Sequence, residues 1–539
     1  MTRRLLAPLA AALVLGGAAG CVDLTEHPVT GITSAYYATP AGFEAAVNAM
    51  YQPLRTHWAL ERGATMTIFG TDEFQKGADG SYKFFNDYTA QLNGDVDFIR
   101  NTWRDFYQGV NTANTVIAAA PTANVPDAAK SLRVGEARFL RGLYYFNLVR
   151  TYGDVPLTLE PTAGVATETN RRPTADVYKS IIDDLNAAIA ALPDKAAQYG
   201  RADKPAAQHL LAEVYLTRAA PGDMALAAAN AKAVVDNPRF KLLPRYKDLF
   251  VMGNEVNSEV VFAIQYTSDP ISNGPGEDFG NKLHLYFGYP YDLEPGMVRD
   301  IANDRPFRRF RPTVWLLGLW DRSKDTRYDD MFKNVWLVNN PNDTKIPKDG
   351  SGKPRLIQGD TAVWMPGVEL GAAEKAKHAY KIYYPSEYQD AVFPVLNKYL
   401  DPTRTSTNQE PGQRDHPIMR LANTYLMLAE ALMRDGKPDQ ALPYVNAVRT
   451  RAAKVGQEAA MQVTAADLNI DFILDERARE LTGETTRWFD LTRTHKLVER
   501  VQKYNPGGGA NVKAFHELRP IPQNEILLST GSMKQNPGY

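Results

Sequence analysis

Residues 418–452 read IMRLANTYLMLAEALMRDGKPDQALPYVNAVRTRA, and this stretch decides the fold. Its first half has apolar residues at every third or fourth position: Ile418, Leu421, Ala422, Tyr425, Leu426, Ala429, Leu432 and Met433. The tetrapeptide Asp435-Gly436-Lys437-Pro438 is then a strong turn signal. After it comes a second apolar stripe: Ala441, Leu442, Val445, Val448 and Ala452. This period places apolar side chains on one face of a helix, so the stretch predicts two amphipathic helices joined by a tight turn.

The small residues of these two predicted helices, with a glycine at the bend, are typical of a tetratricopeptide-like helix pair. Helical periodicity also covers residues 132–148, 177–192 and 207–235. The spacing between these blocks is irregular, so we expect helix pairs inside one globule and not a simple solenoid. The predicted fold class is all-α, with tetratricopeptide-like helix pairs over about 35–240 and 416–500.

A different pattern separates the two helical regions. Between about 241 and 415, Pro, Gly, Asn and Asp divide the chain into short segments, among them the strand-like run Glu259–Tyr266. The window 281–340 holds eleven aromatic residues, close to twice the chain's 10% average. Long ordered loops usually carry function. We therefore predict a long loop-rich insert that binds the ligand, followed after the second helical region by an extended C-terminal segment at 501–539.

The N-terminus has the pattern of an export signal. Arg3 and Arg4 precede the apolar stretch Leu5–Ala19, and small residues then lead into Cys21. An apolar stretch this short, with positive charge in front, is typical of a cleaved signal peptide and too short for a membrane span. We predict that residues 1–20 are removed.

Cys21 is the one cysteine of the chain, and it lies directly after the predicted cleavage point. This position predicts that Cys21 is acylated and anchors the mature protein, residues 21–539, to a membrane as one domain. The alternative is a free thiol after ordinary cleavage, because Ala18 stands where a lipoprotein signal usually has leucine.

Charge and motifs argue against several classes of function. The chain has 61 Lys and Arg against 62 Asp and Glu, without a block of like charges, which disfavours nucleic-acid binding. It contains no zinc-protease, serine-hydrolase or nucleotide-binding motif, and no two histidines lie four residues apart. Adjacent acids such as Asp183-Asp184 would diverge by about 100° on a helix. We therefore predict a binding protein without catalytic residues, metal or cofactor.

Aromatic side chains in loops offer better chemistry for binding. A Trp or Tyr ring can stack on the C–H face of a sugar, and the Tyr hydroxyl adds a polar group. In the segment Tyr286–Tyr291, Gly288 and Pro290 favour an irregular turn from which side chains can point outward. The predicted ligand-binding residues are Tyr286, Tyr289, Tyr291 and, as a fourth, Trp320.

A second aromatic cluster surrounds Gly77 and Gly80 and is predicted to form the facing wall of the site. Its members are Phe74, Tyr82, Phe84 and Phe85. The alternative for every one of these aromatics is a place in the hydrophobic core, where most Trp and Phe residues lie.

The blocks described above resemble the SusD/RagB family of outer-membrane nutrient-binding lipoproteins. The likeness covers nearly the whole mature chain in order, and its last two segments are specific. The segments that carry it are Glu136–Phe146, Tyr152–Pro156, Gly200–Pro205, Leu211–Leu216, Leu428–Ala431, Val445–Arg449, Asp475–Glu480, Arg487–Leu491, Arg519–Pro522 and Gln535–Tyr539.

The resemblance implies a surface-exposed lipoprotein of the outer membrane, with a right-handed scaffold of four tetratricopeptide-like helix pairs. Such a protein would capture an oligosaccharide and deliver it to a SusC-like TonB-dependent transporter, without catalytic residues. A peptide-capturing RagB-like protein is the alternative. A surface glycoside hydrolase is the alternative from another class, and it would need two carboxylates about 5–9.5 Å apart. Ligand-contacting residues differ between family members, so the resemblance assigns none here.

Two of the shared segments look functional in isolation, Asp475–Glu480 and Arg487-Trp488. Their alternating charges beside an aromatic ring predict an internal salt-bridge network, and not a binding site.

Overall fold

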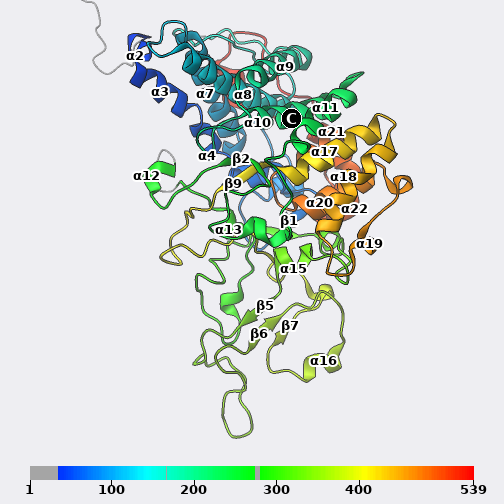
Figure 1. Cartoon of the computed structure of the whole chain (residues 1–539). Helices are drawn as coiled ribbons and strands as arrows, with labels where there is room; N and C mark the ends of the chain where they lie inside the picture. The colour runs from blue at the N-terminus through cyan, green and yellow to red at the C-terminus, as the bar shows by residue number, and fades with distance from the viewer. Residues whose placement is uncertain (1–33, 166, 274–278) are drawn as a thin grey trace, which may run out of the picture.

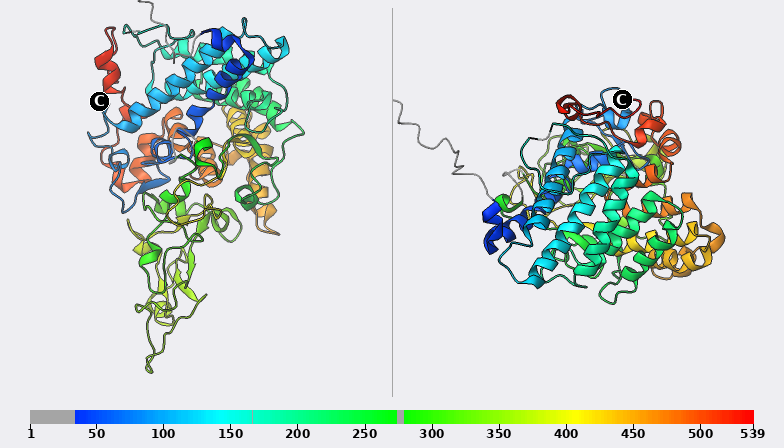
Figure 2. Two further views of the ribbon diagram at one scale, coloured as in Figure 1. Left: turned by 90° about the vertical axis from the view of Figure 1, so that its left-hand side faces the viewer. Right: turned by 90° about the horizontal axis from the view of Figure 1, so that it is seen from above.

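The structure is a computed structural model that describes residues 34–165, 167–273 and 279–539 (Figure 1). The predicted signal peptide and Cys21 lie outside these residues. Helices form the upper body of the molecule, and the insert tapers away below it (Figures 1 and 2). Within the described ranges, no helix is both long enough and apolar enough to cross a membrane.

Eight long helices of the described chain build the body; the first seven pack each against the next, across the insert as well, and the last, α20, packs against α17. Seen from above, most of them lie side by side as one array (Figure 2). They are α7 (Asp97–Ala119), α8 (Asp127–Tyr152), α9 (Thr174–Ala191), α10 (Lys204–Arg218), α11 (Asp223–Val235), α17 (Leu421–Arg434), α18 (Pro438–Arg451) and α20 (Ile470–Leu481).

The two helices predicted within residues 418–452 form as α17 and α18. Gly436 lies between the two helices with φ of +76°, a left-handed conformation that glycine adopts without steric cost. The Lys437 N–H donates to the Leu432 carbonyl at 2.9 Å and closes the turn. On the buried face, Leu426 and Val445 have no exposed surface. The predicted all-α class of tetratricopeptide-like helix pairs is confirmed.

The insert leaves and re-enters the body through one two-stranded ladder. Strand β2 (Val260–Ile264) pairs antiparallel with β9 (His416–Arg420), so the two ends of the insert lie side by side. The predicted strand-like run is thus confirmed as β2, and all five of its residues are buried. Because this ladder closes the insert, α11 packs directly on α17 although about 185 residues separate them.

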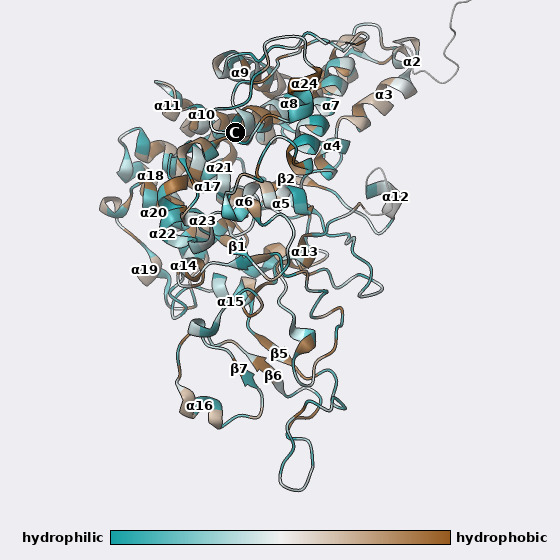
Figure 3. Cartoon of the chain, turned by 180° about the vertical axis from the view of Figure 1, so that it is seen from behind, coloured by the Kyte–Doolittle hydropathy of each residue, from teal (hydrophilic) through white to brown (hydrophobic). Residues whose placement is uncertain are grey.

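The insert has a hydrophobic core of its own. Its lower part is built on the three-stranded sheet β5 (Val335–Leu337), β6 (Thr361–Trp364) and β7 (Lys381–Ile382). Apolar residues of β5 and β6 stand out in Figure 3, and Trp336 and Val363 are buried in a cluster separate from the main core. The insert is therefore a packed unit with little regular structure, and not a set of loose loops.

Buried charges join the insert to the body. Arg327, at the start of α15 (Arg327–Met331), forms ion pairs with Glu476 at 2.8 Å and Glu480 at 3.0 Å on α20. Arg487 pairs with Asp72 at 2.6 Å. The predicted internal salt-bridge network is confirmed, and it extends from the C-terminal helices into the insert.

The remaining elements are short. The C-terminal segment contains α22, α23 and α24, so the prediction of an extended segment at 501–539 is wrong for those residues. The short helices are α2 (Ser34–Ala38), α3 (Pro40–Ala49), α4 (Gln52–Arg55), α5 (Glu61–Thr67), α6 (Phe84–Asp87), α12 (Pro270–Asn273), α13 (Leu283–Tyr286), α14 (Val314–Leu317), α16 (Ala372–Ala376), α19 (Glu458–Met461), α21 (Arg487–Arg493), α22 (Leu497–Tyr504), α23 (Pro506–Gly509) and α24 (Gln523–Leu528). The short strands pair as β1 (Phe74–Lys76) with β3 (Phe310–Pro312) and β4 (Phe332–Lys333) with β8 (Val395–Leu396).

Candidate ligand-binding site

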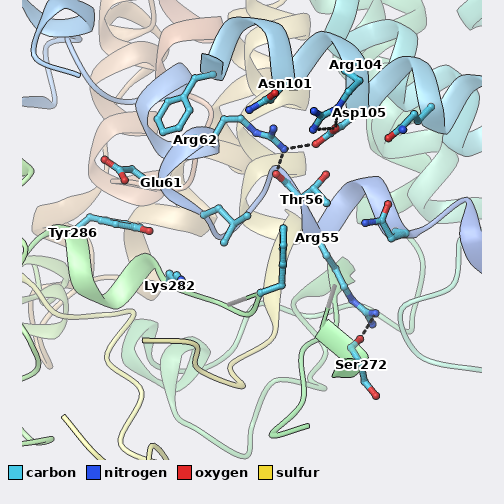
Figure 4. A pocket seen from close by; sticks show the side chains of 15 residues that line it. Arg55, Thr56, Glu61, Arg62, Asn101, Arg104, Asp105, Ser272, Lys282 and Tyr286 are labelled. Carbon is cyan, nitrogen blue, oxygen red and sulfur yellow. Dashed lines mark hydrogen bonds and ion pairs between the residues drawn. The ribbon is translucent and has the colours of Figure 1, made fainter. Parts of the chain in front are cut away.

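A pocket of about 990 Å³ lies between the helical body and the start of the insert. Helices α4, α5 and α7 form its walls on the body side, and α12 and α13 form them on the insert side (Figure 4). Its lining residues are Gln52, Arg55, Thr56, Leu60, Glu61, Arg62, Phe98, Asn101, Arg104, Asp105, Gln108, Ser272, Phe279, Lys282 and Tyr286.

One face of α7 supplies an aromatic ring followed by polar groups. Phe98, Asn101, Asp105 and Gln108 recur at helical spacing and all line the pocket. The ring of Tyr82 stacks on Phe98, with centroids 3.9 Å apart and an interplanar angle of 17°. The Tyr82 hydroxyl donates to Asp97 at 3.0 Å, which holds this ring in place at the start of α7. The α7 face therefore presents a fixed aromatic surface beside hydrogen-bonding groups.

Tyr286 contributes from the opposite side. Its ring packs between Phe307 and Phe310, with centroid distances of 6.0 and 5.9 Å, and its hydroxyl points into the pocket (Figure 4). That hydroxyl forms no hydrogen bond within the described part of the chain. Burial raises the pKa of Tyr286 well above its ordinary value, so the hydroxyl stays protonated. It is available to donate a hydrogen bond to a ligand.

Three side-chain amides of the pocket are also available. Those of Gln52, Asn101 and Gln108 form no hydrogen bond among the described residues. An amide offers both a donor and an acceptor, as a sugar hydroxyl does. A site with a few polar groups beside aromatic walls is typical of small-ligand recognition.

The charged residues of the pocket are held by specific partners. Asp105 accepts from Arg62 at 2.6 Å through one carboxylate oxygen and from Arg104 at 2.9 Å through the other. Burial lowers the pKa of the Arg62 guanidinium, and the charge of Asp105 opposes this effect. Glu61 forms an ion pair with Arg309. Both carboxylates that line the pocket are therefore occupied by guanidinium groups.

A second pocket, of about 670 Å³, adjoins the first. Gln52 and Arg55 line both pockets, so α4 forms the ridge between them. The second pocket is lined further by Tyr51, Tyr199 and Arg201. We call these two adjoining pockets, which share Gln52 and Arg55 of α4, the groove.

The structure places the three predicted tyrosines differently from one another. Tyr286 lines the pocket, but Tyr289 and Tyr291 do not point outward as expected. Tyr289 has no exposed surface and packs edge-on against Trp336, with centroids 4.7 Å apart. The Tyr291 hydroxyl donates to the Asp304 carbonyl at 2.6 Å in the interior. The insert needs these rings to fill its own hydrophobic core, and so the outward placement is wrong for both.

Trp320 and Phe74 are also core residues in this structure. Trp320 is 5% exposed and packs against Tyr328 and Phe332. Phe74 is fully buried, and its ring meets Phe287 at 5.1 Å. Both rings join the insert to the main core, because apolar side chains at a junction between two units are covered from both sides. The core alternative stated for these aromatics therefore holds for both.

The members of the second predicted aromatic cluster also differ from one another in burial. Phe85 is buried with no exposed surface, whereas Tyr82 and Phe84 are partly exposed. Tyr82 lies behind the pocket through its stacking on Phe98. Sequence reasoning missed Phe98 itself. The helical recurrence of polar residues after it, at Asn101, Asp105 and Gln108, is a signal that would have found this face.

In the ranges that the structure describes, no group of three or more His, Cys, Asp and Glu side chains is arranged to hold a metal ion.

A family model described as the SusD family matches residues 258–539, more than half of the chain. The chain belongs to the SusD family. Residues 34–216 also match a SusD-like family model described as starch-binding and associating with the outer membrane. The first match covers most of the insert together with α17–α24, and the second covers the body helices that line the pocket.

Relatives of this SusD family member match over three quarters or more of their own length. SusD-like protein P2 of Formosa agariphila is 28% identical over 96% of this chain and 97% of its own. A SusD-like protein of Bacteroides ovatus is 30% identical over 85% of this chain and 76% of its own. Among solved structures, a laminarin-binding SusD-like protein superposes with a TM-score of 0.71 at 27% identity, covering 93% of this chain and 100% of the other.

Proposed function

We propose that this protein captures an oligosaccharide in the pocket between α4, α7 and α13, and delivers it to a SusC-like TonB-dependent transporter. In this proposal it is an outer-membrane lipoprotein, anchored at the cell surface through acylated Cys21. The observation that carries the proposal is the pairing of an aromatic face with unengaged hydrogen-bonding groups in the pocket of a SusD family member.

The geometry of the pocket suits a sugar. Phe98 offers a ring held by Tyr82, and the Tyr286 hydroxyl points inward from the other side. Stacking on such a ring and hydrogen bonding to the free amides would recognise the two kinds of surface that a saccharide presents. The binding of laminarin by a related SusD-like protein, and of starch by the family matched at 34–216, favours a glycan over a peptide.

The carboxylates of the pocket favour binding over hydrolysis. A glycoside hydrolase uses one carboxyl group as a proton donor and a second as a base or nucleophile. Here Asp105 is bonded by Arg62 and Arg104, and Glu61 is paired with Arg309. Both carboxylates among the described lining residues are thus engaged by guanidinium groups of the protein itself, which favours a binding role.

Calorimetric titration of residues 22–539 with a panel of oligosaccharides and peptides tests the proposed ligand class. For a glycan that binds, Phe98→Ala should weaken affinity about 5-fold to 10-fold, because it removes the stacking surface. Tyr286→Phe should weaken it about 3-fold to 10-fold through the loss of one hydrogen bond. The matched control is Tyr380→Ala, a partly buried aromatic of the insert outside the pocket, which should bind as the wild type does. Binding of peptides alone would contradict the proposal.

The anchor and the transporter need cellular tests. Cys21→Ala should release folded protein from the membrane fraction, because acylation of this residue is the proposed anchor. Purification of the native protein in mild detergent should recover a TonB-dependent β-barrel. Repeated recovery of the protein alone, from cells that make such a barrel, would contradict the delivery step.

A further inference from the structure

The charges of the groove differ from those of the whole protein. The chain carries a formal net charge of −1. Yet, among the residues that the structure describes, the two adjoining pockets are lined by five basic side chains, Arg55, Arg62, Arg104, Arg201 and Lys282, and by two acidic ones, Glu61 and Asp105. A concave surface lined mainly by one sign of charge concentrates ligands of the opposite sign.

Among the described residues, ion pairs compensate this positive charge only in part: Arg201 is paired with Glu136 at 2.9 Å, but other cations of the groove share an anion. Arg62 and Arg104 share the single carboxylate of Asp105. The side chain of Arg104 is 57% exposed, so its guanidinium is open to solvent. Lys282 pairs at 3.3 Å with Glu410, which also pairs with Arg305 at 3.0 Å. At both places, two cations share one anion.

Arg55 lies on the ridge where the two pockets meet. Its guanidinium donates to the backbone carbonyls of Gln265 at 2.9 Å and Ser272 at 2.7 Å. These neutral partners hold the side chain in place without cancelling its charge, and Arg55 forms no ion pair in the described part of the chain. The charge of Arg55 acts to lower the pKa of Asp415. The burial of Asp415 has the larger effect and raises its pKa to about 6.

A buried orphan donor points to the same ligand chemistry. Arg62 is 8% exposed and lines the pocket, and its Nε has no hydrogen-bond partner within the described part of the chain. A planar guanidinium with donors to spare matches the geometry of carboxylate and sulfate groups, which accept two parallel hydrogen bonds. A neutral sugar hydroxyl gains less from such a group.

We propose that the glycan taken by this groove is acidic, carrying carboxylate or sulfate groups that Arg55 and Arg104 bind. This inference rests on the proposed function and narrows its ligand class. Arg55 would engage the substituent of a sugar unit at the ridge, and Arg104 that of a unit beside the α7 face.

The test uses pairs of hexasaccharides that share a backbone and differ in charge. Uronic-acid hexasaccharides of several linkages are compared with the same chains after reduction of their carboxyl groups, and sulfated hexasaccharides with their desulfated forms. Affinity for at least one acidic chain should exceed that for its neutral counterpart about 10-fold or more. That difference should shrink at high salt, because ions screen exposed charges. Whether the carboxylate or the sulfate pair shows the difference identifies the substituent.

Variants locate the effect. Arg55→Gln and Arg104→Gln should each weaken binding of the acidic chain about 5-fold to 10-fold, and change binding of the neutral chain less than about 2-fold. Arg172→Gln is the matched control, since it removes an arginine of similar exposure, 58% for the side chain, that pairs with Asp176 away from the groove. It should leave both affinities unchanged.

Three results would overturn the inference. Equal binding of acidic and neutral chains would remove the preference and leave glycan capture intact. An equal loss of acidic binding in Arg172→Gln would assign the effect to overall charge and not to the groove. Failure of every acidic and neutral chain to bind would remove both this inference and the proposed function.

Discussion

The helical body and the insert are both packed around buried apolar side chains. In the body the sequence pattern identifies these buried residues, and in the insert it does not. In α17, the buried residues Leu421, Leu426 and Ala429 lie among apolar positions that repeat with a helical period. In the insert, Tyr289 and Trp336 are just as buried, yet no repeat marks them. The difference teaches that aromatic enrichment without periodicity identifies a region worth attention, and not the direction in which its side chains point.

The largest expected effect comes from a substitution that removes buried ion pairs between the insert and the body. Arg327 of the insert has a fully buried side chain paired with Asp325, Glu476 and Glu480. Arg327→Ala should lower the free energy of unfolding by about 3–5 kcal/mol, because it leaves buried carboxylates without their cation. Urea denaturation measures this loss. Arg322→Ala, which removes an exposed pair with Asp329, should cost less than about 1 kcal/mol. Similar losses in the two variants would mean that the buried network does not join the insert to the body.

The second test concerns the separate core of the insert. Tyr289→Ala should cost about 3 kcal/mol or more, since it opens a cavity against Trp336. Hydrogen exchange should show the loss first in amides of β5 and β6, with the body helices still protected. The buried Tyr289 hydroxyl has no hydrogen-bond partner among the described residues. Tyr289→Phe should therefore leave the free energy of unfolding unchanged or raise it slightly. Uniform loss of protection across the body would show that the two cores are one unit.

A pH measurement sharpens the picture of the junction. Burial raises the pKa of Glu73, next to β1, from 4.5 to about 8. Between these values the folded protein keeps a proton that the unfolded chain has released. The stabilising contribution of protonated Glu73 is thus complete below about pH 4.5. It falls as the pH rises and is lost once the pH has passed through 8. Glu73→Gln is always neutral, so its stability relative to wild type should improve by about 3–4 kcal/mol between pH 5 and pH 8.5. A constant difference, measured by urea denaturation at both values, would contradict the raised pKa.

The smallest expected effect comes from a substitution in the turn between α17 and α18. Gly436→Ala should cost about 1 kcal/mol through backbone strain at φ of +76°, because no atom lies within 4 Å of the added methyl group. Gly80→Ala also meets no atom within 4 Å, but at a backbone conformation open to other residues, and should be neutral. A melting-temperature comparison is enough, and equal values would show that the turn carries no strain.

Much of the body could be predicted because its information is local. The helix pair at 418–452, the strand run that became β2 and the ionic character of Asp475–Glu480 follow from residues close together in the chain. The pocket could be predicted only in part. Tyr286 was identified from its loop, but Phe98 and Arg55 belong to helices whose polar faces have no obvious partner until the insert is placed against them.

The sequence by itself determined the helical class, the position of the insert and the likeness to a family, since all three depend on patterns and motifs along the chain. Only the tertiary structure decided which aromatic rings belong to the core and which line the pocket. The pairing of β2 with β9 brings the insert back onto the body, where Phe74 is buried against Phe287 and where Phe98, Tyr286 and Arg55 line one pocket. Tyr289 is buried within the insert, against Trp336. Burial depends on what packs from the other side, and for these residues the partner lies far away in the chain.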